Sequence, residues 1–253
     1  MRQRRRGVGC PSPRSSATCR PSKRPRRSTG ASWYVDDTEH VAESPEQGEI
    51  IRDLHSRLTE LARQRGWTRV YVGADNYFAW MPEHPQVRVS PNLFLLNDPP
   101  SPWPRSWQTW RPGQRPPHWA LEVVSEDWAK DYQDGPAKYA LLGCAELVLF
   151  DPDAVRGVTK SQSRVPLTVF RRGEDGALAR VYSGPGPAYS AQLGCWLRAR
   201  RDGYAVQLRL SEDEAGVRLV LNRAEAAEAA RAEAERRLRE LEEELRQSRH
   251  KGP

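Results

Sequence analysis

Near the middle of this 253-residue chain, the order of apolar and polar positions predicts a strand, a helix and a second strand. The first apolar run, residues 119–124, contains the β-branched residues typical of strands, with Glu122 among them. A helix is predicted over about 136–142, with Gly143 as its C-cap. The second apolar run, residues 147–150, predicts another strand. This order and spacing favour a β-α-β crossover.

Glu122 is the one charged residue of the first strand, and apolar residues flank it on both sides. An unpaired carboxylate inside a protein is unfavourable. Glu122 therefore either points from the sheet into solvent or is retained there for a chemical purpose.

On the N-terminal side, the pattern predicts one helix followed by a meander of three or four strands. The helix, 45–66, has apolar residues at three- and four-residue steps: Ile50, Ile51, Leu54, Leu58 and Leu61. The meander consists of strands near 70–72, 77–81, 87–89 and 93–96, and we expect it to continue into the strand that carries Glu122. The loop between them, 97–117, is dense in Pro and Trp. Loops of this length are usually functional, although its tryptophans could simply cover the sheet.

On the C-terminal side, short strands are predicted near 167–170, 179–182 and 205–210, and a long helix over 222–249. Ala and Leu residues recur along that helix at three-, four- and seven-residue steps: Ala227, Ala234, Leu238, Leu241 and Leu245. This spacing is typical of a short coiled coil. The helix either forms a homodimer or remains a solvated tail, because one Leu-rich stretch provides little association energy.

Charge divides the chain into two unequal parts. Residues 1–30 contain nine Arg, one Lys and no acid, and they lack large apolar residues, so we expect a disordered basic tail. Such a tail either contacts phosphates weakly or is a leader outside the native protein. Because its ten cations exceed the net charge of +7, residues 31–253 carry a net charge of −3. The overall charge is therefore no argument that the folded surface binds nucleic acid. We expect one domain over 31–210 and a separate C-terminal helix over 211–253.

Cysteine usage and hydropathy point to the cytoplasm. The four cysteines show no zinc-binding spacing, and Cys144 and Cys195 are expected to be buried free thiols. No apolar run approaches the roughly 20 residues that span a bilayer, and the N-terminus lacks the apolar core of a secretory signal. We therefore expect no membrane partner.

An ordered set of residues between 91 and 152 resembles the Uma-two family of bacterial restriction-endonuclease-like proteins, which have the PD-(D/E)XK nuclease fold. The residues that carry the resemblance are Pro91-Asn92-Leu93-Phe94, Leu121-Glu122-Val123-Val124-Ser125, Asp131, Lys138-Tyr139, Leu142-Gly143, Glu146 and Phe150-Asp151-Pro152. The resemblance implies an α/β (α+β) fold with a mixed central sheet flanked by helices, followed here by the C-terminal coiled-coil helix.

The resemblance also implies a site for a divalent cation, Mg²⁺ or Mn²⁺. Glu122 matches the family's acidic ligand, the main-chain carbonyl of Val123 would be a further ligand, and Lys138 would orient or activate the attacking water. Lys130 is the second choice for that lysine. The family's first Asp is Asn92 here, which removes a negative charge from a site that relies on it. Asp75 and Asp98 are acids close enough in sequence to replace it.

Two functions follow from this resemblance, and a third reading is a structural relic with no present ligand. The first is a metal-dependent DNA endonuclease with Glu122, Lys138 and Asn92 as catalytic residues. The second is a nuclease-fold protein weakened or inactivated by Asn92, which acts as an interaction module through its C-terminal coiled coil. Convergence of the Asn92, Glu122 and Lys138 side chains would favour the site assignment over side chains on different faces of the sheet.

Overall fold

The computed structural model of the protein describes residues 44–125 and 127–250. The predicted basic tail, 1–30, lies outside the described residues. In chain order the elements are α1 (Pro45–Gln64), β1 (Val70–Gly73), β2 (Phe78–Ala79), β3 (Arg88–Val89), β4 (Leu93–Asn97), β5 (Trp107–Gln108), β6 (Trp119–Val123), the π-helical turn η2 (Lys130–Asp134), α2 (Gly135–Leu142), β7 (Glu146–Phe150), α3 (Pro152–Arg156), β8 (Leu167–Arg172), β9 (Leu178–Gly184), β10 (Ala188–Ser190), β11 (Cys195–Asp202), β12 (Ala205–Ser211) and α4 (Arg223–His250).

A six-stranded mixed sheet forms the centre, in the order β1-β4-β6-β7-β8-β9. Its parallel neighbours are β6 and β7, and the other neighbouring pairs are antiparallel. The chain crosses from β6 to β7 through η2 and α2, which confirms the predicted crossover. Gly143 ends α2 with φ of 96°, a left-handed conformation that glycine adopts without steric strain.

Helix α1 forms where the sequence predicts it and covers one face of the central sheet. Ser44 caps its N-terminus by accepting a hydrogen bond from the Gln47 N–H at 3.1 Å, and Pro45 occupies the first turn. The apolar stripe named from the sequence is buried against the sheet. A three-stranded sheet, β10-β11-β12, shares this core, with Leu197, Leu208 and Leu210 among its buried residues.

The other face of the central sheet is covered by α2 and a second three-stranded sheet, β3-β2-β5. Alternation along β6 divides its side chains between the two cores: Leu121 and Val123 pack with α1, whereas Ala120 packs on the α2 side. Glu122 has the same parity as Ala120, so its side chain is on the α2 face of the sheet.

The predicted meander is wrong in its connectivity. Strands β2 and β3 do not continue the central sheet, because β1 pairs directly with β4. Instead, β2 pairs with β3 on one side and with β5 on the other. The Pro- and Trp-rich loop provides β5, and its buried Trp107 stacks on Phe78 with ring centroids 5.8 Å apart.

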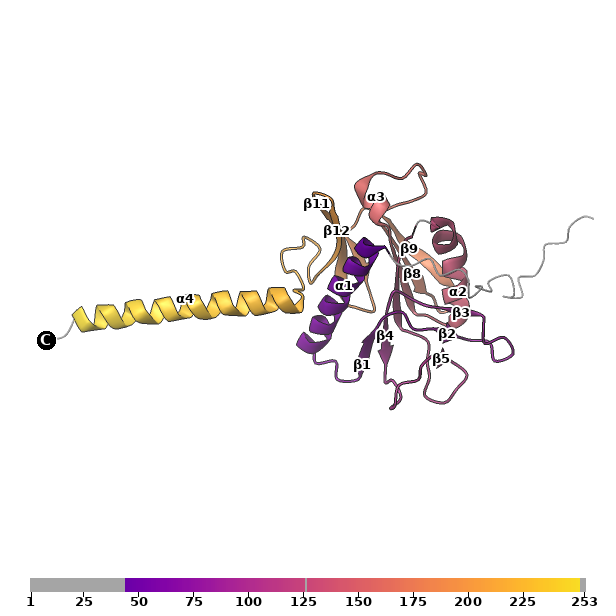
Figure 1. Ribbon diagram of the computed structural model, residues 1–253, viewed down its shortest axis with the longest axis horizontal. Helices are drawn as coiled ribbons and strands as arrows, with labels where there is room; N and C mark the ends of the chain where they lie inside the picture. Colours follow the sequence, from indigo (N-terminus) through magenta and orange to yellow (C-terminus); the bar gives the residue numbers. More distant parts are fainter. Residues whose placement is uncertain (1–43, 126, 251–253) are drawn as a thin grey trace, which may run out of the picture.

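Figure 1 shows α4 leaving the body of the protein as a long straight helix, at the opposite side from α2. The long C-terminal helix is therefore confirmed, whereas its pairing as a coiled coil stays a prediction. The proposed domain boundary at residue 210 also stays a prediction. Among the described helices, none has both the length and the apolar character needed to cross a bilayer.

Candidate active site

The candidate site lies where β4 begins and β6 ends. These strands are antiparallel, and Leu93 of β4 is opposite Leu121 of β6, so the residue before β4 meets the end of β6. That residue is Asn92. The pairing register therefore brings Asn92 and Glu122 together, as the resemblance implies.

Asn92 contacts β6 at two points. Its Oδ1 accepts a hydrogen bond from the Val123 N–H at 2.7 Å, and its own N–H points to Glu122 Oε2 at 3.4 Å. The Val123 donor fixes the orientation of the amide, because only the oxygen can accept from an N–H. The Asn92 oxygen thus extends the strand pairing, and a second lone pair remains on it.

Glu122 is only partly exposed and has an unusual protonation equilibrium. Burial raises the pKa of its carboxyl from 4.5 to about 8, against the opposing effect of the Tyr139 hydroxyl, which donates to Oε1 at 2.6 Å. The negative charge of Asp131 raises this pKa further. In the protein alone, Glu122 therefore holds a proton at neutral pH.

The segment after β6 brings the remaining charged groups to Glu122. Asp131 in η2 accepts hydrogen bonds from the Ser125 N–H at 3.0 Å and the Ser125 hydroxyl at 3.3 Å. Burial raises the pKa of Asp131. Lys138 in α2 is half-buried, and burial lowers the pKa of its ammonium while the negative charges of Asp134, Glu122 and Asp131 oppose that effect.

Lys130, the second choice for the catalytic lysine, also acts on this group of charges. Its positive charge lowers the pKa of Glu122, although its own side chain is exposed. Lys138 is the better placed of the two lysines for stabilising charge inside the site, because it is the more buried.

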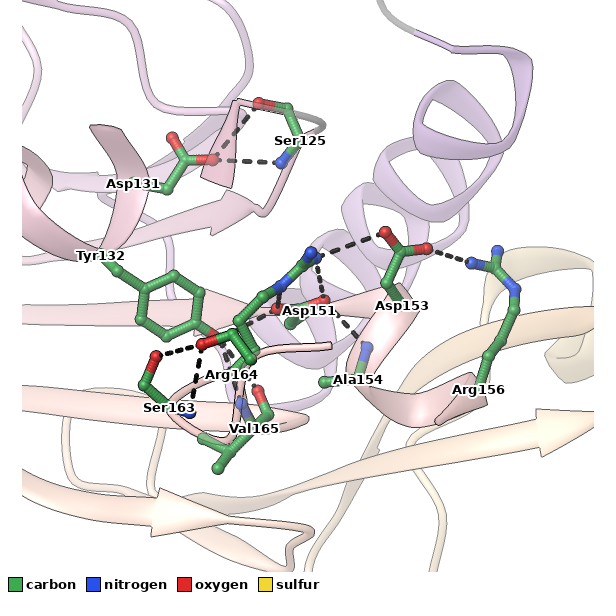
Figure 2. A network of polar contacts seen from close by, with 11 residues as sticks. Ser125, Asp131, Tyr132, Asp151, Asp153, Ala154, Arg156, Ser163, Arg164 and Val165 are labelled. Atoms are coloured by element: carbon green, nitrogen blue, oxygen red, sulfur yellow. Dashed lines mark hydrogen bonds and ion pairs between the residues drawn. The ribbon is translucent and has the colours of Figure 1, made fainter. Parts of the chain in front are cut away.

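A buried network anchors the turn that carries Asp131 (Figure 2). Next to Asp131, the Tyr132 hydroxyl donates to Asp151 Oδ2 at 3.0 Å, at the end of β7. Arg164 forms a bidentate ion pair with Asp151, at 2.7 and 2.8 Å, and reaches Asp153 at 3.3 Å. The Asp151 side chain is fully buried, and Arg164 holds its carboxylate in place. The bond from Tyr132 to this carboxylate therefore fixes η2 relative to the end of β7.

Beside the site, on the α1 side, a cavity of about 390 Å³ opens at the carboxyl ends of the strands. It is lined by the start of α1, the end of β6 and α3, including Gln47, Val123, Ser125 and Arg156. Gln47 Nε2 donates to the Val123 carbonyl at 3.3 Å. The carbonyl expected to bind metal therefore has a side-chain partner from α1.

The acids proposed to replace the missing Asp differ in position. Asp98, although close in sequence, follows the opposite end of β4 and forms an ion pair with Arg69, so it does not replace the missing Asp. Asp75 lies at the correct end, where its N–H donates to the Pro91 carbonyl at 3.1 Å. Its side chain is exposed, and its contribution to the site stays a prediction.

The donor set fits a hard cation through two carboxylates, Glu122 and Asp131. Across residues 44–125 and 127–250, no three side chains among His, Cys, Asp and Glu gather closely enough to hold a metal ion by themselves. Mg²⁺ commonly takes only one or two carboxylates from a protein and completes its shell with water and substrate phosphate. Asn92 and the Val123 carbonyl would add neutral oxygens.

Two contributors to this site could not be recognised from the sequence. Tyr139 appeared only as part of a family pattern, and nothing in its spacing indicated a bond to Glu122. Gln47 lies 76 residues before Val123, and no sequence signal connects them.

Comparison with known proteins places the chain in a family. The family described as "Uma2: Putative restriction endonuclease" matches residues 22–199. Among solved structures, a protein described as a putative nuclease belonging to DUF820, from Anabaena variabilis ATCC 29413, is similar over 60% of this chain and 75% of its own, with a TM-score of 0.41 and 11% sequence identity. No curated protein matches the chain. The family match covers well over half of the sequence and confirms the resemblance, so this chain belongs to the Uma2 family.

Proposed function

We propose that this protein is an endonuclease that hydrolyses phosphodiester bonds of DNA at the Glu122 site, with Mg²⁺ or Mn²⁺ as its cofactor. Family membership supports a nuclease-like function, and DNA is the substrate that the family description suggests. The observation that carries the proposal is the contact between Asn92 and Glu122 across β4 and β6, with Lys138 half-buried among the same charges. The bacterial cytoplasm would be its place of action.

Each residue of the site has a role in this proposal. Glu122 and Asp131 would hold the cation, which when bound would supply positive charge to the scissile phosphate. Lys138 stabilises negative charge that develops on the phosphate oxygens. The Tyr139 hydroxyl holds the Glu122 carboxyl in one orientation through its 2.6 Å hydrogen bond.

Asn92 lowers the metal affinity expected of this site. An Asp at this position would add a third carboxylate to those of Glu122 and Asp131, whereas the amide offers only a neutral oxygen already bound to the Val123 N–H. We therefore propose a slow enzyme that requires a high metal concentration.

A second candidate function is that of an interaction module in which catalysis is weak or lost. The observation that favours it is the set of exposed leucines on α4, Leu238, Leu241 and Leu245, which are 58%, 42% and 59% exposed. Apolar side chains spaced along one face of an exposed helix are typical of a helix that binds another helix.

Cleavage of supercoiled plasmid DNA, with Mg²⁺ or Mn²⁺ titrated, distinguishes the two functions. The proteins are the wild type, Asn92→Asp, Glu122→Gln and the control Asn97→Asp, which adds the same charge at the other, exposed end of β4. An endonuclease predicts metal-dependent cleavage that Glu122→Gln abolishes, that Asn92→Asp increases and that Asn97→Asp leaves unchanged. No cleavage by the wild type, with cleavage by Asn92→Asp, would favour the interaction module. No cleavage by any of the four proteins would refute the endonuclease.

A further inference from the structure

The direction of α4 is fixed by a network at its first turn. Glu225 accepts from Arg57 at 2.6 and 3.0 Å and from Arg209 at 3.0 Å, and the Arg57 side chain is only 1% exposed. Asn222 caps the helix by accepting from the Glu225 N–H at 2.8 Å, while Glu225 accepts from the Asn222 N–H at 3.1 Å. Residues of α1, β12 and the helix start thus hold α4 in place.

Beyond this anchor, α4 projects away from the body of the protein (Figure 1). Every side chain described from residue 227 to 247 is exposed. With 28 residues, the helix is about 42 Å long. A helix with three exposed leucines that projects this far from its domain presents a face suited to a partner helix.

The leucines follow a heptad pattern. With Leu238 and Leu245 at position a, Leu241 falls at position d, and Ala227 and Ala234 occupy the preceding d positions. This 3.5-residue repeat is the pattern of a two-stranded coiled coil. Arg231 occupies the a position between the two alanines, so the apolar seam is unbroken only from Ala234 to Leu245. The seam becomes leucine-rich only at residue 238, about 20 Å along the axis from Glu225 in the first turn, so the leucines lie on the part of α4 that projects from the domain.

The charges beside the seam select the partner and its direction. In a parallel pair in register, Arg237 at position g faces the partner's Glu242 at position e, and two-fold symmetry provides this attraction twice. One antiparallel alignment of the leucines sets Glu242 against the partner's Glu235, which cancels the attraction of Arg237 for the partner's Glu244. In the other antiparallel alignment, Glu242 faces the partner's Glu242 and Glu244 faces the partner's Glu244, so both contacts are repulsive.

We propose that α4 binds α4 of a second copy of this chain as a parallel, in-register coiled coil centred on Leu238, Leu241 and Leu245. Both domains then lie at the same end of the pair. This deepens the second candidate function by naming the partner. The pairing itself does not depend on cleavage, so a failure of the endonuclease proposal leaves the following test intact.

Sedimentation equilibrium of the full chain measures the pairing. The wild type is expected to be a dimer that dissociates on dilution, and Leu241→Lys is expected to be a monomer. Arg237→Glu and Glu242→Arg each turn the two attractions into repulsions, and we expect each to weaken the dimer about tenfold. An equimolar mixture of these two variants, and the double variant, should regain wild-type affinity.

Arg246→Glu is the matched control. Arg246 is at position b, off the seam, and forms an ion pair with Glu243 at 2.9 Å, three residues away, just as Arg237 does with Glu240 at 3.3 Å. It therefore reproduces any loss of helix stability without touching the interface. We expect its dimer to equal the wild type. A wild type that is monomeric at every concentration, or a mixture that fails to recover, would overturn the proposal.

Disulfide formation determines the direction. In a background with Cys10→Ser and Cys19→Ser, Ala234→Cys places a thiol at position d. In the parallel pair the two thiols share one layer and oxidation should link the chains, since d-position Cα atoms fall within the roughly 7 Å that a disulfide spans. In either antiparallel alignment they lie at least about 16 Å apart along the axis. A dimer that stays unlinked would refute the parallel arrangement.

Discussion

Glu122→Gln tests whether the carboxyl of the candidate site holds a proton in the folded protein. The pKa of Glu122 is raised from 4.5 to about 8, mainly by burial. Between these pH values the folded state binds a proton that the unfolded chain has released, so the wild type loses stability as pH rises from about 4.5 to about 8. Glutamine keeps the shape of the protonated side chain and still accepts from Tyr139, but it does not titrate.

The size of the effect follows from the pKa change. At about 1.4 kcal/mol per pKa unit, the rise from 4.5 to about 8 has a ceiling of about 5 kcal/mol. The side chain is partly exposed, and water screens its charge, so we expect about 2 kcal/mol at pH 9. For a protein of this size, Glu122→Gln should therefore raise Tm by about 4–8 °C at pH 9 relative to the wild type. At pH 4 the two proteins should unfold at nearly the same temperature.

Differential scanning calorimetry of both proteins from pH 4 to pH 9, with chelator present, measures this difference. Other titrating groups act on both proteins and largely cancel in the comparison. Glu83→Gln removes an exposed acid from the loop between β2 and β3, and its difference from the wild type should be small at every pH. A difference between Glu122→Gln and the wild type that stays constant with pH, or is largest in acid, would refute the protonated carboxyl.

Three further substitutions test the surroundings of the site and the end of α2. Arg164→Leu leaves the fully buried Asp151 without its ion pair and should destabilise the protein by about 3–5 kcal/mol in urea unfolding; a loss below about 1 kcal/mol would contradict the network in Figure 2. Tyr139→Phe removes the hydroxyl that lowers the pKa of Glu122. In proteins that carry Tyr139→Phe, the pH range over which Glu122→Gln becomes more stable than Glu122 should therefore move upward. An unchanged midpoint of that stability difference would count against the 2.6 Å bond. Gly143→Ala forces a left-handed residue and sets a Cβ 3.3 Å from a ring carbon of Pro116, and should lower stability by more than about 1 kcal/mol by calorimetry; an equal or higher Tm would argue against this cap.

Local patterns predicted the elements that depend on neighbours in sequence. The helix α1, the strands β6 and β7 and the cap at Gly143 follow from periodicity, β-branched residues and a glycine at the end of an apolar run. Pairing between distant segments could not be predicted in this way. Strand β2 has only two residues in the ladder, and its partner β5 comes from a loop whose tryptophans gave no strand pattern.

Strand β11 was not predicted, although apolar residues and arginines alternate over 197–200. Its arginines, Arg198, Arg200 and Arg201, obscure the alternation of Cys195, Leu197 and Ala199 toward the core. The strand becomes recognisable only in the structure, where β11 pairs with β12.

The candidate site shows the same division. Family resemblance named Asn92, Glu122 and Lys138, but the sequence could not show that Tyr139 donates to Glu122, because that bond depends on how α2 packs on the sheet. It also could not exclude Asp98. That residue is only six positions after Asn92, but the whole length of β4 separates the two residues in the fold. The roles of all these residues stay predictions until cleavage is measured.

Asn92 affects both the stability of the folded protein and the binding of a cation at this site. The amide oxygen makes a bond to the Val123 N–H that an aspartate would also make, so the amide retains the strand contact while removing one negative charge. A carboxylate at this position would lie beside Glu122 and near Asp131, and without a cation the repulsion should destabilise the protein by on the order of 2 kcal/mol at pH 9. Bound Mg²⁺ would reverse that loss, because binding to the folded state raises its stability.

Asn92→Asp should therefore unfold at a lower temperature than the wild type in chelator and gain more from Mg²⁺ than the wild type does. Asn97→Asp, at the far end of β4, should show neither change. If saturating Mg²⁺ did not raise the unfolding temperature of Asn92→Asp, the carboxylates gathered here would not form a cation site even with the added negative charge at position 92. The approach of residue 92 to β6 would then have to be explained by strand pairing alone, because the bond to the Val123 N–H is the contact that asparagine and aspartate can both make at this position.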